Sequence, residues 1–401
     1  MKPFGRLLDF DQARQMALDL VKPIQQTETV SLDASIGRVL GRDVISRVSV
    51  PPFDRAAMDG YAVIASDTFG SSRGQPRKLA VTGAVFAGDL PDMRVGAGNA
   101  VQIATGARLP AGADAVVMVE ETSPDGGIVN ILKAVYPGAN IARTGEDIKK
   151  GSMLLTAGTR LNPGKVGMLA SQGMTEIEVF RKPRISVLPT GEEIAVTGSP
   201  LQPGQIWDIN SHTVSAVVSL SGGEVTDLPI ARDQPEALRS AIIEALDSDI
   251  VIISGGSSVG ERDLMSRTLA DLGEVLFHGI QIKPGKPTLL AKVNDKPVLG
   301  LPGYPTSCLI NAYLLAAPMV KKMAQREFEH VTTVDLPLAE AVPGSVGRRQ
   351  FLPVQIRSQK AKPLFKESGA ITATALADGY IDIAANVDIL PEGEVVRVTL
   401  F

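Results

Sequence analysis

The sequence predicts a multidomain protein of the α/β plus β class, with a doubly wound α/β domain flanked by β-rich domains and a small β-barrel at the C-terminus. Its 401 residues exceed the usual size of one hydrophobic core. The hydrophobic pattern also changes along the chain, because strand and helix patterns alternate between residues 183 and 324 and short β-branched runs dominate elsewhere. Such alternation is typical of a largely parallel sheet with helices on both faces.

The N-terminal part begins with one helix and continues as a β-rich region. Asp11 is the expected N-cap of this helix, and Pro23 lies beyond its end. From residue 29 to residue 180, short runs such as residues 115–119 are separated by Gly, Pro and Asp clusters, which indicates strands joined by turns. The tail after residue 331 has the same character, and we expect a small β domain there.

The central region is expected to alternate strands with helices. Strand 250–253 is apolar throughout, as is typical of a parallel strand covered on both faces. The predicted order is strand 185–188, helix 211–220, a strand near Val225, a helix capped by Asp233 and ending at Leu246, strand 250–253, helix 264–272, strands near Val275, Thr288 and Val298, and a long helix from Thr306.

The composition excludes several classes of protein. Hydrophobic residues make up 44% and charged residues 21% of the chain, which argues against disorder. The net charge of -4 offers no basic surface for nucleic acid. No apolar stretch approaches the roughly 18 residues that cross a membrane, and the single cysteine, Cys308, forms no internal disulfide. We therefore expect a cytoplasmic protein that binds neither nucleic acid nor a membrane.

Ligands of open α/β sheets bind beyond the carboxyl ends of the strands, so the loops there are the candidate sites. Gly255 and Gly256 let main-chain N–H groups approach an anion, and the hydroxyl of Ser257 adds a donor. The alternative for these residues is a tight turn. Lys283 and Lys286 flank a Pro-Gly pair that restricts the backbone, so both ammonium groups can face one anion. The alternative here is a solvated basic loop.

Acidic residues supply the opposite charge. Carboxylates beside an anion pocket suit Mg²⁺, because this cation prefers oxygen ligands and neutralises phosphate. Each acid also has a simpler alternative as a helix cap or a surface charge. The candidates are Glu193, Asp249, Asp263, Asp59 and Asp147.

The candidate loops, taken together, resemble those of the molybdopterin molybdenumtransferases, the MoeA-type proteins that include the E domain of gephyrin. The resemblance spans nearly the whole chain. Each segment is weak evidence alone, but their joint order is specific. The segments are residues 52–63 (PFDRAAMDGYAV), 103–107 (IATGA), 144–148 (TGEDI), 190–193 (TGEE), 255–260 (GGSSVG), 283–287 (KPGKP) and 301–305 (LPGYP).

The resemblance implies a four-domain subunit that works as a homodimer and a contact with the molybdopterin adenylyltransferase. The cleft would lie between the α/β domain of one subunit and the Asp59-carrying domain of the other. The implied domains are residues 1–49 with 149–182 (an N-terminal helix and a discontinuous β-rich linker domain), 50–148 (an inserted β-rich domain carrying Asp59), 183–327 (the α/β molybdopterin-binding domain) and 328–401 (a C-terminal β-barrel).

The resemblance also assigns residues to the cleft. Tyr304 stands where the family commonly has Asn, and Ser257 stands where Val is common. Neither change removes a charge, but the ring of Tyr304 leaves the shape of the pocket open. The implied catalytic residues are Asp59, Thr105, Asp147, Glu193, Asp249, Lys283 and Lys286. The implied substrate-binding residues are Gly255, Gly256, Ser257, Asp263, Pro302 and Pro305.

Our hypothesis from the sequence is that molybdate docks at Lys283 and Lys286 and that adenylated molybdopterin lies across the Gly255-Gly256 loop. Mg²⁺, held by Glu193 and Asp249, would contact the pyrophosphate, and metal insertion would be coupled to AMP release. Two alternatives stay open. One is the preceding adenylyltransferase, which needs only the α/β domain. The other is a non-catalytic scaffold, as in the receptor-anchoring gephyrin E domain.

Overall fold

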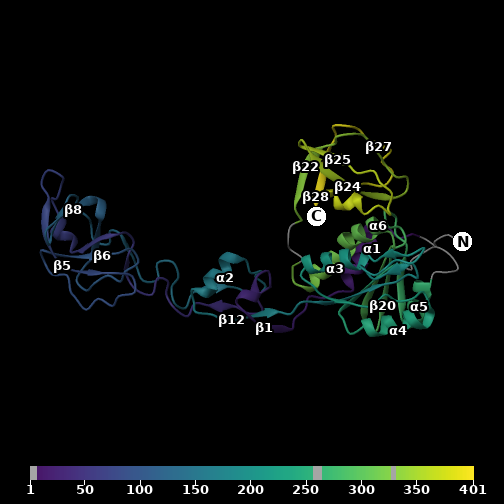
Figure 1. The fold of residues 1–401 in the computed structure, drawn as a ribbon, viewed down its shortest axis with the longest axis horizontal. Coiled ribbons are helices and arrows are strands. Elements are labelled where there is room, and N and C mark those ends of the chain that lie inside the picture. Colours follow the sequence, from purple (N-terminus) through teal and green to yellow (C-terminus); the bar gives the residue numbers. More distant parts are fainter. Residues whose placement is uncertain (1–6, 256–263, 327–330) are drawn as a thin grey trace. The chain divides into compact units, whose positions relative to one another are not determined.

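The computed structural model of the protein describes residues 7–255, 264–326 and 331–401. The chain forms two compact units (Figure 1). The β unit comprises Val30–Ile36 and Arg42–Ile177, and the α/β unit comprises Met1–Thr29, Gly37–Gly41 and Glu178–Phe401. Within the described part of the chain, none of the helices combines the length and the apolar character that a membrane crossing requires.

The β unit is built around a six-stranded sheet with the order β7-β4-β6-β5-β9-β8. Strand β4 is buried along its whole length, because Tyr61 and Val63 enter one hydrophobic cluster and Ala62 enters the other. This is the period-two pattern of a sheet that is covered on both faces. The strands are β4 (Gly60–Val63), β5 (Arg77–Val85), β6 (Asn99–Ile103), β7 (Ala115–Met118), β8 (Thr122–Asp125) and β9 (Ile128–Ile131).

Smaller elements complete the β unit. Two antiparallel pairs join distant parts of the chain, β2 with β11 and β3 with β10. Strands β1 (Thr27–Ser31) and β12 (Glu176–Phe180) run from one unit into the other. The remaining bounds are β2 (Val44–Ile45), β3 (Arg55–Ala56), β10 (Ile141–Ala142), β11 (Met153–Leu155), helix α2 (Pro163–Ala170) and the 3₁₀ turns η1 (Asp33–Ser35), η2 (Ala65–Thr68) and η3 (Val119–Glu121).

The α/β unit contains a second six-stranded sheet, with the order β16-β13-β17-β21-β20-β18. The first four strands are parallel, as predicted, but β20 and β18 run antiparallel to their neighbours. The cause is the hairpin at Asn294 and Asp295, which both adopt positive φ and join β20 directly to β21. The strands are β13 (Arg184–Pro189), β16 (Glu224–Asp227), β17 (Ile250–Ser254), β18 (Glu274–His278), β20 (Leu289–Val293) and β21 (Lys296–Leu301).

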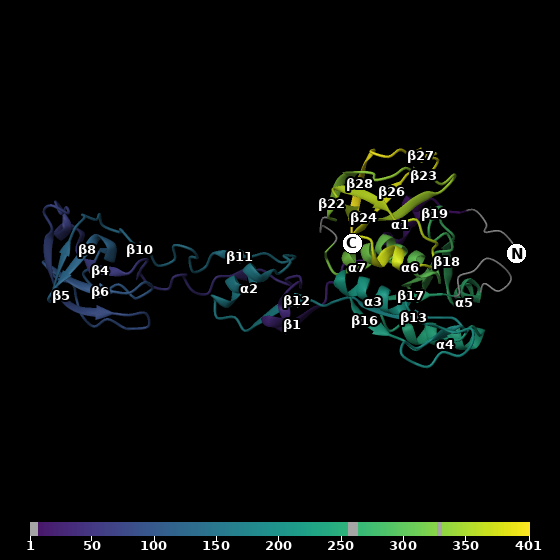
Figure 2. The same cartoon turned by 45° about the horizontal axis from the view of Figure 1, so that its top comes forward.

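Helices cover both faces of this sheet (Figures 1 and 2). Phe10 and Val214 belong to one hydrophobic core, and Leu238 and Met265 belong to the core on the opposite face. The first group of helices is α1 (Phe10–Asp19), α3 (Asn210–Leu220), α6 (Pro305–Asn311), the π-helical turn η4 (Ala312–Ala316) and α7 (Ala317–Met323). The second group is α4 (Pro235–Ala245) and α5 (Leu264–Leu272).

Two predicted helix caps are wrong. Helix α1 is capped by Asp9 and not by Asp11, because Asp9 Oδ1 accepts hydrogen bonds from the main-chain N–H groups of Asp11 (2.9 Å) and Gln12 (3.3 Å). Helix α4 begins at Pro235 with Gln234 as its N-cap residue, so Asp233 lies one position outside the helix. The carboxylate of Asp233 therefore has a different environment, which is described with the site.

The C-terminal part forms a third sheet with the order β19-β24-β26-β28-β22, and β25 also pairs with β24. A bridge between Leu338 and Ala361 connects the chain just after β22 to β25, which pairs with β24. The last strand of the order is therefore linked back to the first strands. The bounds are β19 (Ile282–Lys283), β22 (Thr333–Pro337), β23 (Val342–Pro343), β24 (Arg349–Arg357), β25 (Lys360–Pro363), α8 (Thr372–Ala375), β26 (Gly379–Ile383), β27 (Ile389–Leu390) and β28 (Val395–Leu400).

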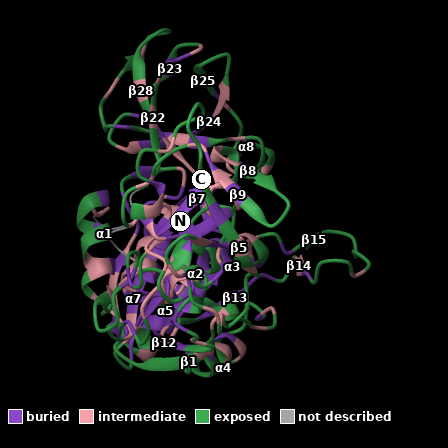
Figure 3. Ribbon diagram, turned by 90° about the vertical axis from the view of Figure 1, so that its left-hand side faces the viewer, coloured by how far each residue is buried: buried purple, intermediate pink, exposed green. Residues whose placement is uncertain are grey.

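Strand β19 comes from the central region of the sequence, but it pairs with β24 of the C-terminal sheet and sets Lys283 opposite Gln350. Residues 282–287, here called the lysine loop, therefore connect the α/β sheet with the C-terminal sheet. The short parallel pair β14 (Ile194–Ala195) and β15 (Ile206–Trp207) extends away from the main sheet (Figure 3). Strand β15 is exposed, whereas Ala195 of β14 is buried.

Candidate active site

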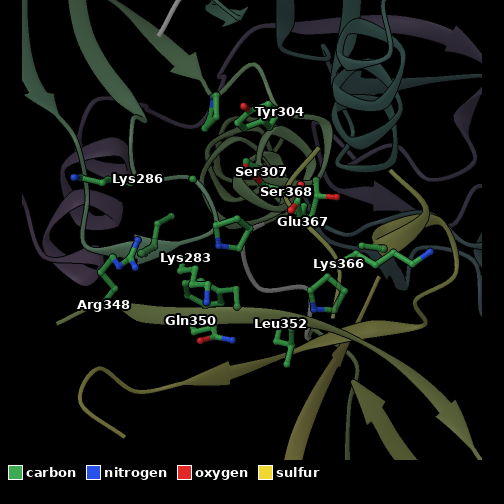
Figure 4. A pocket seen from close by; sticks show the side chains of 18 of the residues that line it. Lys283, Lys286, Tyr304, Ser307, Arg348, Gln350, Leu352, Lys366, Glu367 and Ser368 are labelled. Carbon is green, nitrogen blue, oxygen red and sulfur yellow. The ribbon is translucent and has the colours of Figure 1, made fainter. Parts of the chain in front are cut away.

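A pocket of about 380 Å³ opens where the α/β sheet meets the C-terminal sheet (Figure 4). Its walls come from three parts of the chain. These are residues 282–287, four residues of the turn that begins α6 (Pro302, Tyr304, Thr306 and Ser307), and C-terminal residues that include Arg348, 350–353 and 366–368. The volume lies in the range of small-molecule sites, about 300–1,000 Å³. The structure thus brings two of the predicted loops together and adds a third wall that the sequence did not indicate.

The lining of this pocket is strongly cationic. Lys283, Lys286, Arg348 and Lys366 all line it, whereas Glu367 is the one acid among the described lining residues. In Figure 4, Lys283 and Arg348 lie along one wall, and the hydroxyl groups of Ser307 and Ser368 lie closer to the centre. Cationic groups with hydroxyl donors are the usual surroundings of a bound oxyanion.

The second wall is the turn that begins α6. The main-chain N–H of Thr306 donates to the carbonyl of Ser368 (3.0 Å), and its hydroxyl donates to the carbonyl of Ala370 (2.9 Å). These two bonds hold the C-terminal segment against the helix. Pro302 lines the pocket, but Pro305, the first residue of α6, does not.

Tyr304 stands at the rim of the pocket with 66% of its surface exposed. Its ring lies close to Gly369, where an added Cβ would be 3.7 Å from the nearest ring carbon. The side chain that departs from the family pattern is thus largely exposed and lies apart from Lys283 and Arg348 in the lining of the pocket (Figure 4).

The glycine loop starts beside the same turn. An added Cβ on Gly303 would lie 3.6 Å from Gly255 Cα, so the two main chains are close neighbours. Gly255 has φ of +98°, and a Cβ there would lie 2.2 Å from the carbonyl oxygen of Thr190. Its N–H donates to the carbonyl of Leu301 (3.3 Å). This N–H is therefore already paired with a neighbouring strand, and the anion contact of the glycine loop stays a prediction.

The other residues predicted in this loop, Gly256, Ser257 and Asp263, lie outside the described residues.

Asp249 is not part of the pocket. It precedes β17, so it lies at the amino end of that strand, about 20 Å of extended chain from Gly255 at the carboxyl end. Its oxygens accept hydrogen bonds from Arg181 Nη1 (2.7 Å), Arg181 Nη2 (3.0 Å) and the main-chain N–H of Arg184 (2.8 Å). Burial raises the pKa of Asp249, but these hydrogen bonds outweigh it and hold the pKa below the ordinary value. The carboxylate thus has a structural role.

A different acid, Asp233, lies at the carboxyl edge of the sheet. It follows a bridge between Thr190 and Ala231 and accepts a hydrogen bond from the main-chain N–H of Glu192. Desolvation raises its pKa, and the negative charges of Glu193 and Glu192 raise it further. The predicted residue Glu193 therefore has Asp233 as its acidic neighbour. Asp233 was not among the candidate acids predicted from the sequence, because it was interpreted as a helix cap.

The remaining predicted residues lie in the β unit. The Oδ1 atom of Asp59 accepts hydrogen bonds from the main-chain N–H (2.6 Å) and the hydroxyl (2.9 Å) of Thr105. These bonds lower the pKa of the exposed Asp59 carboxyl group. Asp147 is exposed in the loop after Thr144, and that loop is tied to Asp54 through the N–H and hydroxyl of Thr144. Two of the predicted residues, Asp59 and Thr105, are thus in direct contact.

The predicted magnesium ligands do not fit together. Glu193 lies at the carboxyl edge of the sheet, whereas Asp249 lies at the amino edge and is held by Arg181. Across residues 7–255, 264–326 and 331–401, no group of three or more His, Cys, Asp or Glu side chains is arranged to hold a metal ion.

The fold and the pocket together define a class of protein: a multidomain α/β protein with a pocket lined by basic side chains at the edge of a mixed sheet. Comparisons identify the family. The chain matches the MoeA N-terminal region (domain I and II) at residues 8–173, a probable molybdopterin binding domain at residues 186–322 and the MoeA C-terminal region (domain IV) at residues 335–401.

Relatives and solved structures agree with this match. The molybdopterin molybdenumtransferase of Haemophilus influenzae is 38% identical over 354 residues, which cover 86% of this chain and 85% of that protein. The Bacillus subtilis molybdopterin molybdenumtransferase is 33% identical, with 94% and 90% covered. A crystal structure of the molybdopterin biosynthesis MoeA protein from Pyrococcus horikoshii has a TM-score of 0.84 and 41% identity, and the match covers 98% of this chain and 99% of that one. The chain belongs to the MoeA family of molybdopterin molybdenumtransferases.

Proposed function

We propose that the protein inserts molybdate into adenylated molybdopterin and releases AMP. The cationic pocket carries this proposal, because four basic residues and two serines line a volume suited to a small ligand. A tetrahedral dianion offers four oxygens to such donors. Family membership supplies the substrate, since the relatives are named for this transfer.

The charge distribution explains how the chain acts on its substrates. Lys283, Lys286 and Arg348 hold the molybdate oxygens and keep the dianion next to the turn at residues 302–304. The glycine loop starts beside that turn, so the phosphate end of the adenylated substrate can lie there while its sulfur end faces the pocket. Fixed positive groups also stabilise the negative charge that develops as AMP leaves, and no covalent protein intermediate is required.

Acidic residues act around this centre. The acids at the carboxyl edge of the sheet are Glu193 and Asp233, whereas the sequence predicted Glu193 and Asp249. Mg²⁺ stays in the proposal only as a cation that would neutralise the phosphate charge of the substrate. We also propose a homodimer in which Asp59 and Thr105 of the partner subunit face this edge, and a contact with the adenylyltransferase that makes the substrate.

The experiment that tests the proposal compares two reactions. With adenylated molybdopterin and molybdate, the purified protein should release AMP and form molybdenum cofactor. With ATP and metal-free molybdopterin, it should form no adenylated product. The opposite pair of results would identify an adenylyltransferase. The match to MoeA regions before and after the α/β domain favours the transferase, since the adenylyltransferase needs that domain alone.

A further inference from the structure

A buried amide lies directly beneath the lysine loop. Asn311 is the last residue of α6 and is fully buried (0% exposed). Its Nδ2 donates to the carbonyl of Ser307 (2.7 Å) and lies 3.5 Å from the carbonyl of Pro284. One side chain thus reaches both walls of the pocket, because Ser307 belongs to the helix turn and Pro284 to the lysine loop.

The other end of the loop is held by the same group. The side chain of Thr288 is also 0% exposed, and its Oγ1 lies 2.7 Å from the carbonyl oxygen of Gly285 and 3.1 Å from Asn311 Oδ1. Both oxygens are acceptors, so they share the single proton of the Thr288 hydroxyl. The buried side chains of Asn311 and Thr288 therefore contact each other and the main chain of the lysine loop.

Gly285 shows how tightly the loop packs on this amide. Its φ is +103°, and an added Cβ would lie 1.8 Å from Asn311 Nδ2. The main chain between the two lysines therefore rests on the amide itself. The helix also departs from α geometry immediately after Asn311, where the π-helical turn η4 begins. Such turns are frequent at functional sites.

We propose that Asn311 is a positioning residue for molybdate binding. It fixes the main chain between Lys283 and Lys286 against α6, so that both ammonium groups start from set positions on the pocket wall. Fixing the loop before binding reduces the conformational entropy that the loop loses when the dianion arrives. This inference rests on the proposed function, because it assigns the loop to an oxyanion.

The test is the substitution Asn311→Leu, which keeps the branched shape of the Asn side chain, enlarges it and removes its hydrogen bonds. The Kd for molybdate, measured by calorimetry, should rise about tenfold, which corresponds to about 1.4 kcal/mol. Thr288→Val should weaken binding in the same direction. The double variant should lose less than the sum of the two, because both substitutions break one contact.

The control is Cys308→Ala, which changes a fully buried residue of the same helix that does not line the pocket. It should lower the melting temperature and leave the molybdate Kd within twofold of the wild-type value. If Asn311→Leu gave the same pattern as this control, with lower stability and unchanged affinity, Asn311 would be a structural residue and the proposal would be overturned.

Hydrogen exchange separates this inference from the proposed function. The N–H groups of Ile280 and Thr288 donate to carbonyls within the loop, at Lys286 (2.9 Å) and Gly285 (3.3 Å). Exchange in residues 280–288 should accelerate in Asn311→Leu and stay at the wild-type rate in Cys308→Ala. Unchanged exchange in Asn311→Leu overturns the positioning role. A wild-type protein that binds no molybdate overturns the proposed function and, with it, the assignment of the loop to this ligand.

Discussion

Replacing Asp249 with Ala should destabilise the α/β unit and leave the transferase site intact. The carboxylate accepts two hydrogen bonds from Arg181 and one from the main chain of Arg184. The side chains of Asp249 and Arg181 are only 13% and 25% exposed. Removing one partner of a fully buried ion pair costs about 3–5 kcal/mol, and the partial exposure of Arg181 reduces the expected loss here to about 2–3 kcal/mol.

The pH dependence of this loss follows from the lowered pKa of Asp249. A carboxyl group whose pKa is lower in the folded than in the unfolded protein adds stability above its unfolded value, about 3.9. That contribution disappears as the pH falls through the folded value. The difference between wild type and Asp249→Ala should therefore be constant near neutral pH and should vanish in strong acid.

The assay combines urea unfolding, followed by circular dichroism, with AMP release under saturating substrate. The matched control is Asp335→Ala, which breaks an exposed ion pair with Arg397. That variant should unfold at the wild-type midpoint, since exposed pairs contribute little. An Asp249→Ala variant that unfolds like the wild type but releases AMP far more slowly would refute the structural role and restore Asp249 to the site.

Three further predictions concern the site itself. Lys283→Gln and Lys286→Gln should each raise the molybdate Kd about tenfold, as expected for a lost charge-assisted hydrogen bond; calorimetry at low and high salt should show the loss shrinking as salt rises. Asp233→Asn should slow AMP release yet raise the unfolding midpoint at neutral pH, because desolvation and the charge of Glu193 raise the Asp233 pKa, and this gain should disappear as the pH falls below the folded pKa. Tyr304→Asn changes shape without changing charge, so KM for adenylated molybdopterin should change while the molybdate Kd stays within about twofold.

The sequence predicted the fold class correctly because its main signals are local. The apolar run that became β17 and the helix at residues 210–220 are visible in short windows. The antiparallel edge was missed, although Asn294 and Asp295 between two apolar runs are a known hairpin signal. The family resemblance was confirmed, whereas the four domain boundaries remain predictions.

The site was only partly predictable, for physical reasons that differ between residues. Asp249 directly precedes its strand, and this position alone places it at the amino end of a parallel sheet, away from any ligand. Asp233 follows β16 of the same sheet and lies at the carboxyl end, where ligands bind, but its position two residues before Pro235 suggested a helix cap. Arg348 was not accessible to sequence reasoning, because it reaches the pocket through the two-residue pairing of β19 with β24.

The most direct test of the account is to locate the oxyanion. Crystals soaked in molybdate or tungstate, with data collected at an absorption edge of the metal, should show an anomalous peak in the pocket between the Lys283–Lys286 loop and Arg348. A peak at the glycine loop alone, or none in a crystal where the pocket is open to solvent, would contradict the claim that these cationic groups bind the metal substrate.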